Sequence, residues 1–424
     1  MLLQVAADRS QREKGFFEKT EIPLITMASD ITGTVSETLL DKTIVVGVTG
    51  SIAAVRIVDL IRDLIRRGAE VHAAMSPAAQ QILHPFALEY ASGHPVITGI
   101  TGRVEHVEFC GVSGKADLLL IAPATANTIG KMALGIDDTP VTTFATTAIG
   151  SGKPVMVVPA MHEAMYRHPA VLKNLETLKA MGVEVVDPKM EEGKAKIADN
   201  SRTVMEVERR LGPWDLARKR IVITSGSNAE AVDSIRILTN RASGKTGVAL
   251  ALEARRRGAD VTLISRFPQN LPLREVQAES AKEMLDAVLR EVGAGCDALI
   301  SAAAVADYTL DQAQGKISSG QEMTLVLRPT KKIIKAVRAE FPDLVIVGFK
   351  AEVGVSDEEL VRRATKSLCS SDLSLVVAND VREGGMGTEE NRVMIIDREG
   401  RTRVVEGKKR VIAKCIIDVL AEVL

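Results

Sequence analysis

The sequence contains few aromatic residues and carries almost no net charge. Phenylalanine, tyrosine and tryptophan make up 3% of its 424 residues, and 54 basic residues balance 55 acidic ones. Proteins that bind nucleic acids usually present a basic surface, and many stack bases on aromatic rings. We therefore expect no nucleic-acid partner.

Long apolar runs are also missing. No stretch reaches the roughly 18 to 20 uncharged apolar residues that a membrane-spanning helix needs. Charged residues interrupt positions 1–40 throughout, so the apolar core of a signal peptide is not evident there. These absences predict a cytoplasmic protein without a membrane partner.

Cysteine is scarce as well. The four cysteines, at positions 110, 296, 369 and 415, lie far apart and form no Cys-x-x-Cys pair. This spacing argues against a disulfide framework and against a structural zinc site. We interpret all four as free thiols and expect most of them to be buried.

The sequence does contain alternating strand and helix segments. Residues 43–48 form a continuous apolar run, typical of a strand buried on both faces of a parallel sheet, and the small-residue loop 49–54 follows. The next helix and strands are predicted at 53–67, 70–74, 116–122 and 154–159. This alternation predicts a doubly wound α/β fold.

The same design returns in the second half of the chain. Residues 219–226 repeat the strand and loop, and the next helix ends in Arg256-Arg257-Gly258-Ala259, as the first ends in Arg66-Arg67-Gly68-Ala69. We therefore predict two tandem Rossmann-like doubly wound domains. Because Pro213 breaks the preceding helix, we divide the chain into a leader at 1–40, a first domain at 41–212 and a second at 213–424.

The two units differ in the number of residues between the small-residue loop and the end of the following helix. Gly68 follows Gly50 by 18 positions, whereas Gly258 follows Gly226 by 32. The second unit therefore carries an insert at the mouth where its strand ends. Ligands of such folds bind at this mouth, so we expect the insert to hold one.

Two loops of the first domain have the composition of a phosphate site. The loop at 50–53 follows a strand and opens a helix, so its backbone N–H groups and the helix dipole favour an anion. By itself this loop is also compatible with a tight turn that binds nothing. A second small-residue loop, 122–128, ends another strand, and two loops that converge on one crevice predict a phosphorylated cofactor.

Two histidines accompany these loops. His106 is compatible with a structural role, but an imidazole at a cleft edge also suits a general base near neutral pH. His162 follows a strand that ends at Pro159, so we expect it at the same crevice as Asn127. The methionines beside it are compatible with ordinary core packing.

The second domain offers a different set of polar residues. Residues 236–245 are a basic segment before a helix, compatible with a solvated loop, and the P-loop spacing fails because Thr239 stands where its first glycine belongs. Downstream, we predict a buried strand over 300–308 that leads into Asp307. Asp307 suits Mg²⁺ bound to a triphosphate, and Lys316 suits charge neutralisation.

Taken together, these motifs resemble the bifunctional phosphopantothenoylcysteine decarboxylase and phosphopantothenate-cysteine ligase of coenzyme A synthesis. Seven segments carry the resemblance in the family's order, over residues 40–424: GVTGSIAA, APATANT, PAMHEAMY, NRASGK, SAAAVADY, VGFKAE and VANDV. The resemblance implies a flavoprotein-type domain followed by a ligase-type domain.

For the second domain, the resemblance implies CTP-dependent coupling of 4'-phosphopantothenate to cysteine with Mg²⁺. The carboxylate would attack the α-phosphate of CTP, and the cysteine amine would displace CMP from the acyl cytidylate. Asn240 would stabilise this intermediate, Arg236 would contact the substrate, and Asp307 would hold the metal. The other implied nucleotide contacts are Ala304, Lys316, Lys331, Lys332, Ile333, Ile334, Phe349 and Lys366.

For the first domain, the resemblance implies bound FMN and decarboxylation of the cysteinyl product to 4'-phosphopantetheine. The flavin would oxidise the thiol-bearing carbon to a thioaldehyde, through which carbon dioxide can leave. His106 occupies the family's base position, and Met161 and His162 would face the substrate. The implied flavin contacts are Gly50, Ser51, Ile52, Ser76, Thr125 and Asn127.

The sequence departs from the bacterial pattern at some of these positions. His162 stands where the bacterial form has asparagine, and the active-site flap lacks the bacterial cysteine. We expect Lys194 or Lys196 to replace that cysteine as proton donor, as in an archaeal-like version of the family. Residues 226–233 and Lys366 also differ from the usual ligase motifs.

The resemblance further implies a homo-oligomer that assembles through both domains, with small molecules as its other partners. Two alternatives remain open. A flavin-binding regulatory or scaffold protein would not need the flap cysteine, and a ligase that has lost its decarboxylase activity would not need it either.

Overall fold

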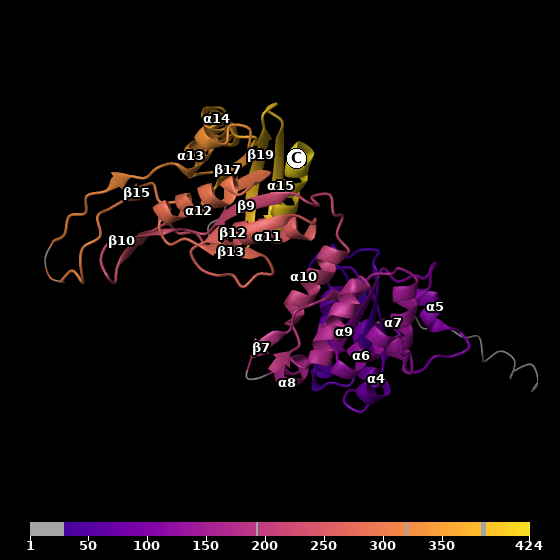
Figure 1. Ribbon diagram of the computed structural model, residues 1–424. Coiled ribbons are helices and arrows are strands. Elements are labelled where there is room, and N and C mark those ends of the chain that lie inside the picture. Colours follow the sequence, from indigo (N-terminus) through magenta and orange to yellow (C-terminus); the bar gives the residue numbers. More distant parts are fainter. Residues whose placement is uncertain (1–28, 192–193, 319, 321, 383–386) are drawn as a thin grey trace, which may run out of the picture. The chain divides into compact units, whose positions relative to one another are not determined.

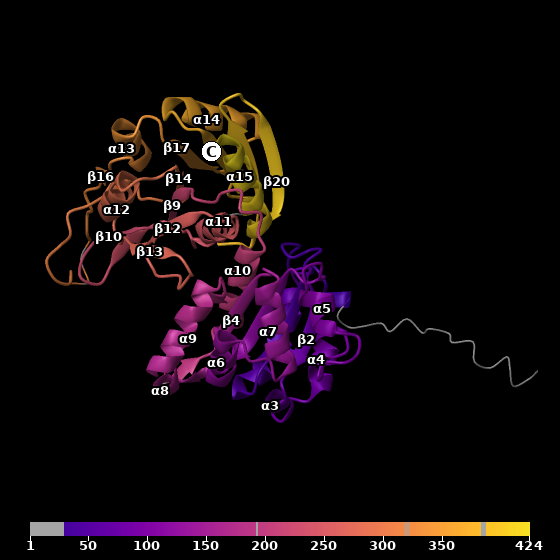
Figure 2. The same cartoon turned by 45° about the vertical axis from the view of Figure 1, so that its right-hand side comes forward.

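The computed structural model describes residues 29–191, 194–318, 320, 322–382 and 387–424. The chain divides into two compact units, the first ending at Asn200 and the second beginning at Ser201. In Figures 1 and 2 each unit is a sheet flanked by helices. This is the predicted tandem doubly wound architecture, which is confirmed.

The first unit contains a five-stranded parallel sheet in the order β2-β1-β3-β4-β6. The strands are β1 (Thr43–Val48), β2 (Glu70–Met75), β3 (Leu118–Ala124), β4 (Val155–Pro159) and β6 (Glu184–Val185). The helices are η1 (Ser29–Ile31), η2 (Ile52–Arg56), α2 (Ile57–Ile65), α3 (Pro77–Gln80), α4 (Pro85–Ser92), α5 (Glu105–Cys110), α6 (Ala126–Leu134), α7 (Pro140–Gly150), α8 (Glu163–Tyr166) and α9 (Pro169–Ala180).

Helices cover both faces of this sheet because its strands are apolar on both sides. Val45 of β1 packs with α5, α6, α7 and α9 in one core. Its neighbours Ile44 and Val46 point to the other face and are also fully buried. The α2 and α4 helices contact each other and β2. The carboxyl ends of the strands remain available for a site.

The second unit contains an eight-stranded sheet in the order β13-β12-β9-β14-β17-β18-β19-β20. Six strands pair in parallel, β19 pairs antiparallel with β18, and β20 pairs antiparallel with β19. The strands are β9 (Arg220–Ser225), β12 (Asp260–Ser265), β13 (Arg274–Gln277), β14 (Ala298–Ser301), β17 (Val345–Glu352), β18 (Leu375–Asp380), β19 (Glu390–Asp397) and β20 (Thr402–Lys408). The helices are α10 (Asn200–Arg210), α11 (Lys245–Arg256), α12 (Ala281–Gly293), α13 (Ile333–Glu340), α14 (Asp357–Ser370) and α15 (Lys409–Val423).

Two helical layers enclose this second sheet. Leu250 of α11 and Ile416 of α15 share one core with the sheet, whereas α12, α13 and α14 share the core on the opposite face. Figure 1 shows α11 and α15 apart from α13 and α14. The predicted strand and helix alternation therefore holds in both units.

Some predicted element boundaries were wrong. The predicted helix at 53–67 begins as the 3₁₀ helix η2 and continues as α2. The strand predicted over 300–308 ends at Ser301, because the chain then leaves the sheet. There the N–H of Ala304 donates to the carbonyl of Gly226 (2.8 Å) and that of Ala306 to Oδ1 of Asn228 (2.7 Å). Asp307 is therefore in a loop.

The described part of the predicted leader packs on the first unit. The N–H groups of Gly33, Val35 and Leu39 donate to carbonyls at the end of α2, at 3.2, 2.9 and 2.8 Å. Leu39 is completely buried. Residues 1–28 of the leader lie outside the described residues.

The cysteines are more exposed than predicted. Cys110 is buried, but Cys296 and Cys415 are half-buried and Cys369 is exposed, so the expectation that most are buried was wrong. Cys369 lies on the outer side of the α14 helix, away from the core that this helix covers. In the described part of the chain, no helix has the length and apolarity to cross a membrane.

Candidate active sites

A cavity of about 510 Å³ opens at the carboxyl ends of β1, β2, β3 and β4. This is where ligands bind in doubly wound folds. Seven predicted site residues line it: Gly50, Ser51, Ser76, Thr125, Asn127, Met161 and His162. The other lining residues are Pro77, Ala78, Ala126, Thr128, Lys131, Thr139, Thr142, Ala160 and Met165.

The helices α6 and α7, of 9 and 11 residues, begin at this cavity, and each has a threonine at its N-cap. Oγ1 of Thr125 accepts from the N–H of Thr128 (3.3 Å) at the start of α6. Oγ1 of Thr139 accepts from the N–H of Thr142 (3.2 Å) at the start of α7. Helix N-termini carry partial positive charge and spare N–H donors. The cavity wall therefore favours an anionic group.

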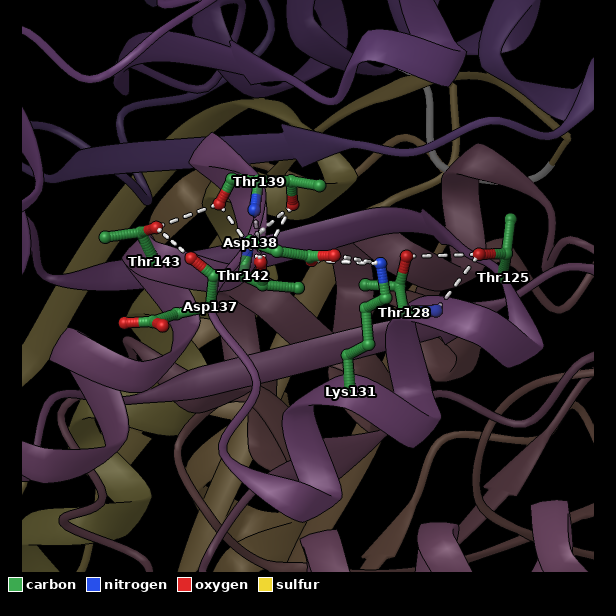
Figure 3. A network of polar contacts seen from close by, with 8 residues as sticks. All are labelled: Thr125, Thr128, Lys131, Asp137, Asp138, Thr139, Thr142 and Thr143. Atoms are coloured by element: carbon green, nitrogen blue, oxygen red, sulfur yellow. Dashed lines mark hydrogen bonds and ion pairs between the residues drawn. The ribbon is translucent and has the colours of Figure 1, made fainter.

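A polar network beside these caps includes a cation. Figure 3 shows Lys131 of α6 reaching Asp138, where its ammonium donates to both carboxylate oxygens at 2.9 and 2.7 Å. The Thr139 and Thr142 hydroxyls lie 2.8 Å apart in the same network. Lys131, Thr139 and Thr142 line the cavity and were not predicted as site residues. Thr139 before Pro140 is a helix-start signal that could have identified the cap.

The predicted substrate residues lie on a small sheet with the flap. β5 (Met161–His162), β7 (Lys189–Glu191) and β8 (Lys194–Lys196) form a three-stranded antiparallel sheet in the order β5-β8-β7. His162 is in register with Lys194, and Met161 with Ala195. The flap backbone therefore lies beside the predicted substrate residues. The side chain of Lys194 lies outside the described residues, and Lys196 is half-buried.

Three predicted residues with described side chains do not line this cavity: Ile52, His106 and the flap residue Lys196. Ile52 has 78% of its surface exposed. His106 lies on the short helix α5, half-buried, and its Nδ1 atom is buried without a hydrogen-bond partner among the described residues. Within one copy of the described chain, the candidate base is thus not among the residues around the cavity.

In the second unit, the predicted insert is a hairpin rather than a loop. Strands β10 (Ala229–Ala231) and β11 (Ile237–Thr239) pair antiparallel. Gly226 and Gly244 flank the hairpin, both with positive φ, and a Cβ on Gly244 would lie 3.2 Å from the Cα of Gly226. The two ends of the insert therefore approach closely, and both the tight contact and the positive φ favour glycine at position 244.

Asp233 fixes the hairpin turn. Its buried carboxylate accepts from the N–H groups of Arg236 (2.6 Å), Ile235 (2.8 Å) and Ile317 (3.1 Å), and it pairs with the Arg236 guanidinium (2.5 Å). These N–H donors, with the nearby arginine, lower the pKa of Asp233 to about 2. The predicted substrate residue Arg236 is therefore held in place by an ionised carboxylate.

Asn240 contacts the loop that follows β14. Its side-chain amide donates to the carbonyls of Ala304 (3.0 Å) and Val305 (3.3 Å). In the same loop, the exposed Asp307 forms an ion pair with Lys332, the residue directly before α13. The structure thus brings together four predicted ligase residues: Asn240, Ala304, Asp307 and Lys332.

A buried network that was not predicted supports this loop. The carboxylate of Glu230 accepts from Asn228 (3.0 Å), from the Thr309 hydroxyl (2.5 Å) and from the N–H of Ala281 (2.8 Å). Glu230 and Asn228 are 6% and 0% exposed. No local sequence pattern indicates this network, because its members come from three separate segments.

The remaining predicted nucleotide residues are dispersed. Lys316 and Lys366 are exposed, the latter on α14, and Lys331 precedes α13. Ile333 and Ile334 pack in the core under α12 and α14, whereas Phe349 packs in the core on the opposite face of the sheet. The three apolar side chains are therefore engaged in packing, whereas the three lysines are exposed.

Comparisons with known proteins match both units. Residues 32–212 match the family model described as Flavoprotein, and residues 216–424 match the DNA/pantothenate metabolism flavoprotein C-terminal domain. The chain is 47% identical to the coenzyme A biosynthesis bifunctional protein CoaBC of Thermococcus kodakarensis, over 93% of this chain and 98% of that protein.

A second relative and a solved structure match the chain at lower identity. The protein of the same name from Methanocaldococcus jannaschii is 36% identical, over 91% of this chain and 95% of that protein. A solved structure of the C-terminal domain of such a protein is 31% identical, covers 49% of this chain and 97% of that chain, and gives a TM-score of 0.41. The chain belongs to the family of coenzyme A biosynthesis bifunctional proteins CoaBC.

Proposed function

We propose that this chain catalyses two consecutive steps of coenzyme A synthesis: ligation of 4'-phosphopantothenate to cysteine, then decarboxylation to 4'-phosphopantetheine. One observation carries the proposal. The chain has 47% identity over 93% of its length to a bifunctional coenzyme A biosynthesis protein, and each unit has its own polar site. The same likeness favours an enzyme over a scaffold protein.

The first site fits FMN. Its volume of about 510 Å³ lies within the range of small-molecule sites, roughly 300 to 1,000 Å³. The helix starts at Thr125 and Thr139 suit the phosphate, and Met161, Met165 and the alanines supply apolar contacts for the ring. Bound flavin would supply the electron acceptor and hydride donor that decarboxylation of the cysteinyl product requires.

The residues of the chain bind and orient the substrate in this proposal. Met161 and His162 contact the cysteinyl end, and the flap strand β8 next to them covers it. Lys194 or Lys196 supplies the final proton. His106 takes a proton from the substrate as general base.

Because His106 does not line the cavity of its own copy, the proposal includes a homo-oligomer. In that assembly His106 of one copy reaches the cavity of another. On α5, Val107 and Glu108 beside His106 are exposed. In the described structure, this part of α5 is therefore accessible to a second copy of the chain.

The second site suits the ligase reaction. Asp307 offers one exposed carboxylate, and Mg²⁺ commonly binds through one or two carboxylates together with phosphate oxygens. In this proposal the Lys332 ammonium turns from Asp307 to a phosphate when CTP and Mg²⁺ bind. Asn240, already oriented by the carbonyls of Ala304 and Val305, stabilises the acyl cytidylate, and Arg236 contacts the substrate.

Two variants test whether the activities are separate. His106→Asn should abolish carbon dioxide release and leave pyrophosphate release unchanged. Asn240→Ala should slow pyrophosphate release by about 10²-fold or more and leave the decarboxylation of added 4'-phosphopantothenoylcysteine unchanged. Each variant is the control for the other. Loss of both activities in either variant would contradict the assignment.

A further inference from the structure

Two histidines and a glutamate gather at the edge of the first sheet. Glu70 and His72 are two positions apart at the amino end of the edge strand β2, so their side chains share one face. His94 follows the α4 helix, whose end is set by Gly93 with φ +75°. It begins a segment that pairs with β2, where the N–H of Ile97 donates to the carbonyl of Ala73 (2.9 Å).

The side-chain atoms of this trio are near the spacing that a metal ion requires. Oε1 of Glu70 lies 2.9 Å from Nε2 of His72 and 3.8 Å from Nε2 of His94. The two imidazole rings are stacked with centroids 4.2 Å apart. One possible ligand atom from each residue lies within 4.8 Å of the other two. Ligands of a tetrahedral zinc ion are about 3.4 Å apart, because the bonds are about 2.0 to 2.1 Å long.

The surroundings of the trio hold the imidazoles in place. The His72 side chain is 15% exposed, and its ring packs against Phe109 of α5 with centroids 4.5 Å apart. Lys115 lies over the outer side of Phe109 and pairs with Glu108 at 2.6 Å. The Lys115 ammonium is thus bound to the Glu108 carboxylate, whereas the exposed Glu70 carboxylate contacts the two histidines of the trio.

The trio lies far from the flavin cavity. Glu70 begins β2, and Ser76 directly after its end lines the cavity. At about 3.3 Å per residue, six positions of strand separate them by about 20 Å. The trio is therefore not part of the flavin cavity of its own copy.

We propose that Glu70, His72 and His94 bind a divalent transition-metal ion such as Zn²⁺. Two imidazoles and one carboxylate are a common protein ligand set for zinc, with water in the fourth position. The bound ion would cross-link the segment at 94–97 to the edge strand β2 and stabilise this corner of the first unit. Mg²⁺ prefers oxygen ligands and would not compete there.

Metal titration of the full chain tests the proposal. Untagged protein is treated with a chelator and desalted, and Zn²⁺ binding is followed by calorimetry in excess Mg²⁺. We expect about one ion per chain and a higher melting temperature with Zn²⁺. Co²⁺ should bind competitively and give the visible absorption of a site with nitrogen ligands.

Matched variants locate the ion. His94→Gln should weaken Zn²⁺ binding at least about tenfold and remove the thermal shift. His84→Gln changes an exposed histidine at the opposite end of α4, and it should leave the Zn²⁺ affinity and the thermal shift unchanged. Flavin content reports folding independently, because the cavity is remote from the trio. If His94→Gln loses its flavin, the exposed Glu70→Gln replaces it as the decisive variant.

The results that would overturn the proposal are specific. Absence of saturable Zn²⁺ binding by the wild-type chain would refute the site. Binding of equal affinity in the wild type, Glu70→Gln and His94→Gln would place the ion elsewhere. A thermal shift that persists in both variants would show that Zn²⁺ does not act through this trio.

Discussion

The buried hydroxyl of Thr49, after β1, contacts the backbone of Thr125, after β3, and so joins two of the loops that line the cavity. It accepts a hydrogen bond from the Thr125 N–H at 3.2 Å and donates one to the Pro123 carbonyl at 2.6 Å. Thr49 is 1% exposed. One side chain thus fixes the loop after β1 against the loop after β3, and these loops form the cavity wall.

Replacement of Thr49 by valine should weaken flavin binding. Valine keeps the shape of threonine but leaves the buried Pro123 carbonyl without its donor, a loss of about 1 to 3 kcal/mol, and leaves the Thr125 N–H without its acceptor. We expect a lower melting temperature and a protein purified with less flavin, measured by absorbance. Thr49→Ser keeps the hydroxyl and should retain the flavin. Equal flavin affinity in Thr49→Val and the wild type would contradict this role.

Acid should destabilise the second unit partly through Asp233. N–H donors and Arg236 lower the pKa of Asp233 to about 2 in the folded protein. The ionised carboxylate therefore contributes its full stabilisation of the fold above the unfolded pKa of about 3.9, and this contribution is lost as the pH falls through about 2. Asp233→Asn should therefore lower the urea midpoint at pH 7, and this difference should shrink between pH 4 and pH 2. The surface pair of Asp286 with Lys282 provides a control, since Asp286→Asn should change stability by less than about 1 kcal/mol. A difference independent of pH would refute the assignment.

The thiols should differ widely in reactivity. Burial raises the pKa of Cys110 to about 12 and that of Cys296 to about 11, whereas Cys369 is exposed. At pH 8 a disulfide reagent should modify Cys369 first and Cys110 only after unfolding. Mass spectrometry of tryptic peptides identifies the modified residues, and Cys369→Ser should remove the fast phase. Rapid modification of Cys110 in the folded protein would contradict the described packing.

Asp307 should be needed for ligation and not for decarboxylation. Asp307→Asn removes the charge that the proposal assigns to Mg²⁺, so pyrophosphate release should fall about 10²-fold. Decarboxylation of added 4'-phosphopantothenoylcysteine should be unchanged. Asp311→Asn removes a neighbouring exposed carboxylate paired with Arg328 and should retain full ligation. Normal pyrophosphate release by Asp307→Asn would exclude a metal role.

The sequence predicted the features that local pattern controls. The buried strands at 43–48 and 220–225 are continuous apolar runs, and the loops after them contain small residues, so the strand positions and the crevice followed from periodicity. Asn127 and His162 were expected at one crevice because parallel strands end at the same edge, and both line the cavity. The family resemblance supplied the chemistry.

Long-range contacts were beyond prediction. The strand expected over 300–308 ends at Ser301 because Asn228 and Gly226 bind the following backbone, and Asn228 lies far away in the sequence. His72 and His94 meet through pairing of the segment after α4 with β2, which no local motif indicates. Lys131 belongs to the cavity because α6 begins there.

The most direct measurement is the yield of two products from one preparation. Purified protein is incubated with 4'-phosphopantothenate, cysteine, CTP and Mg²⁺, and pyrophosphate and carbon dioxide are quantified together. We predict that both appear, in equal final amounts, with 4'-phosphopantetheine as the product. Pyrophosphate without carbon dioxide would mean that only the ligase is active, and the absence of both from flavin-loaded protein would contradict the bifunctional assignment.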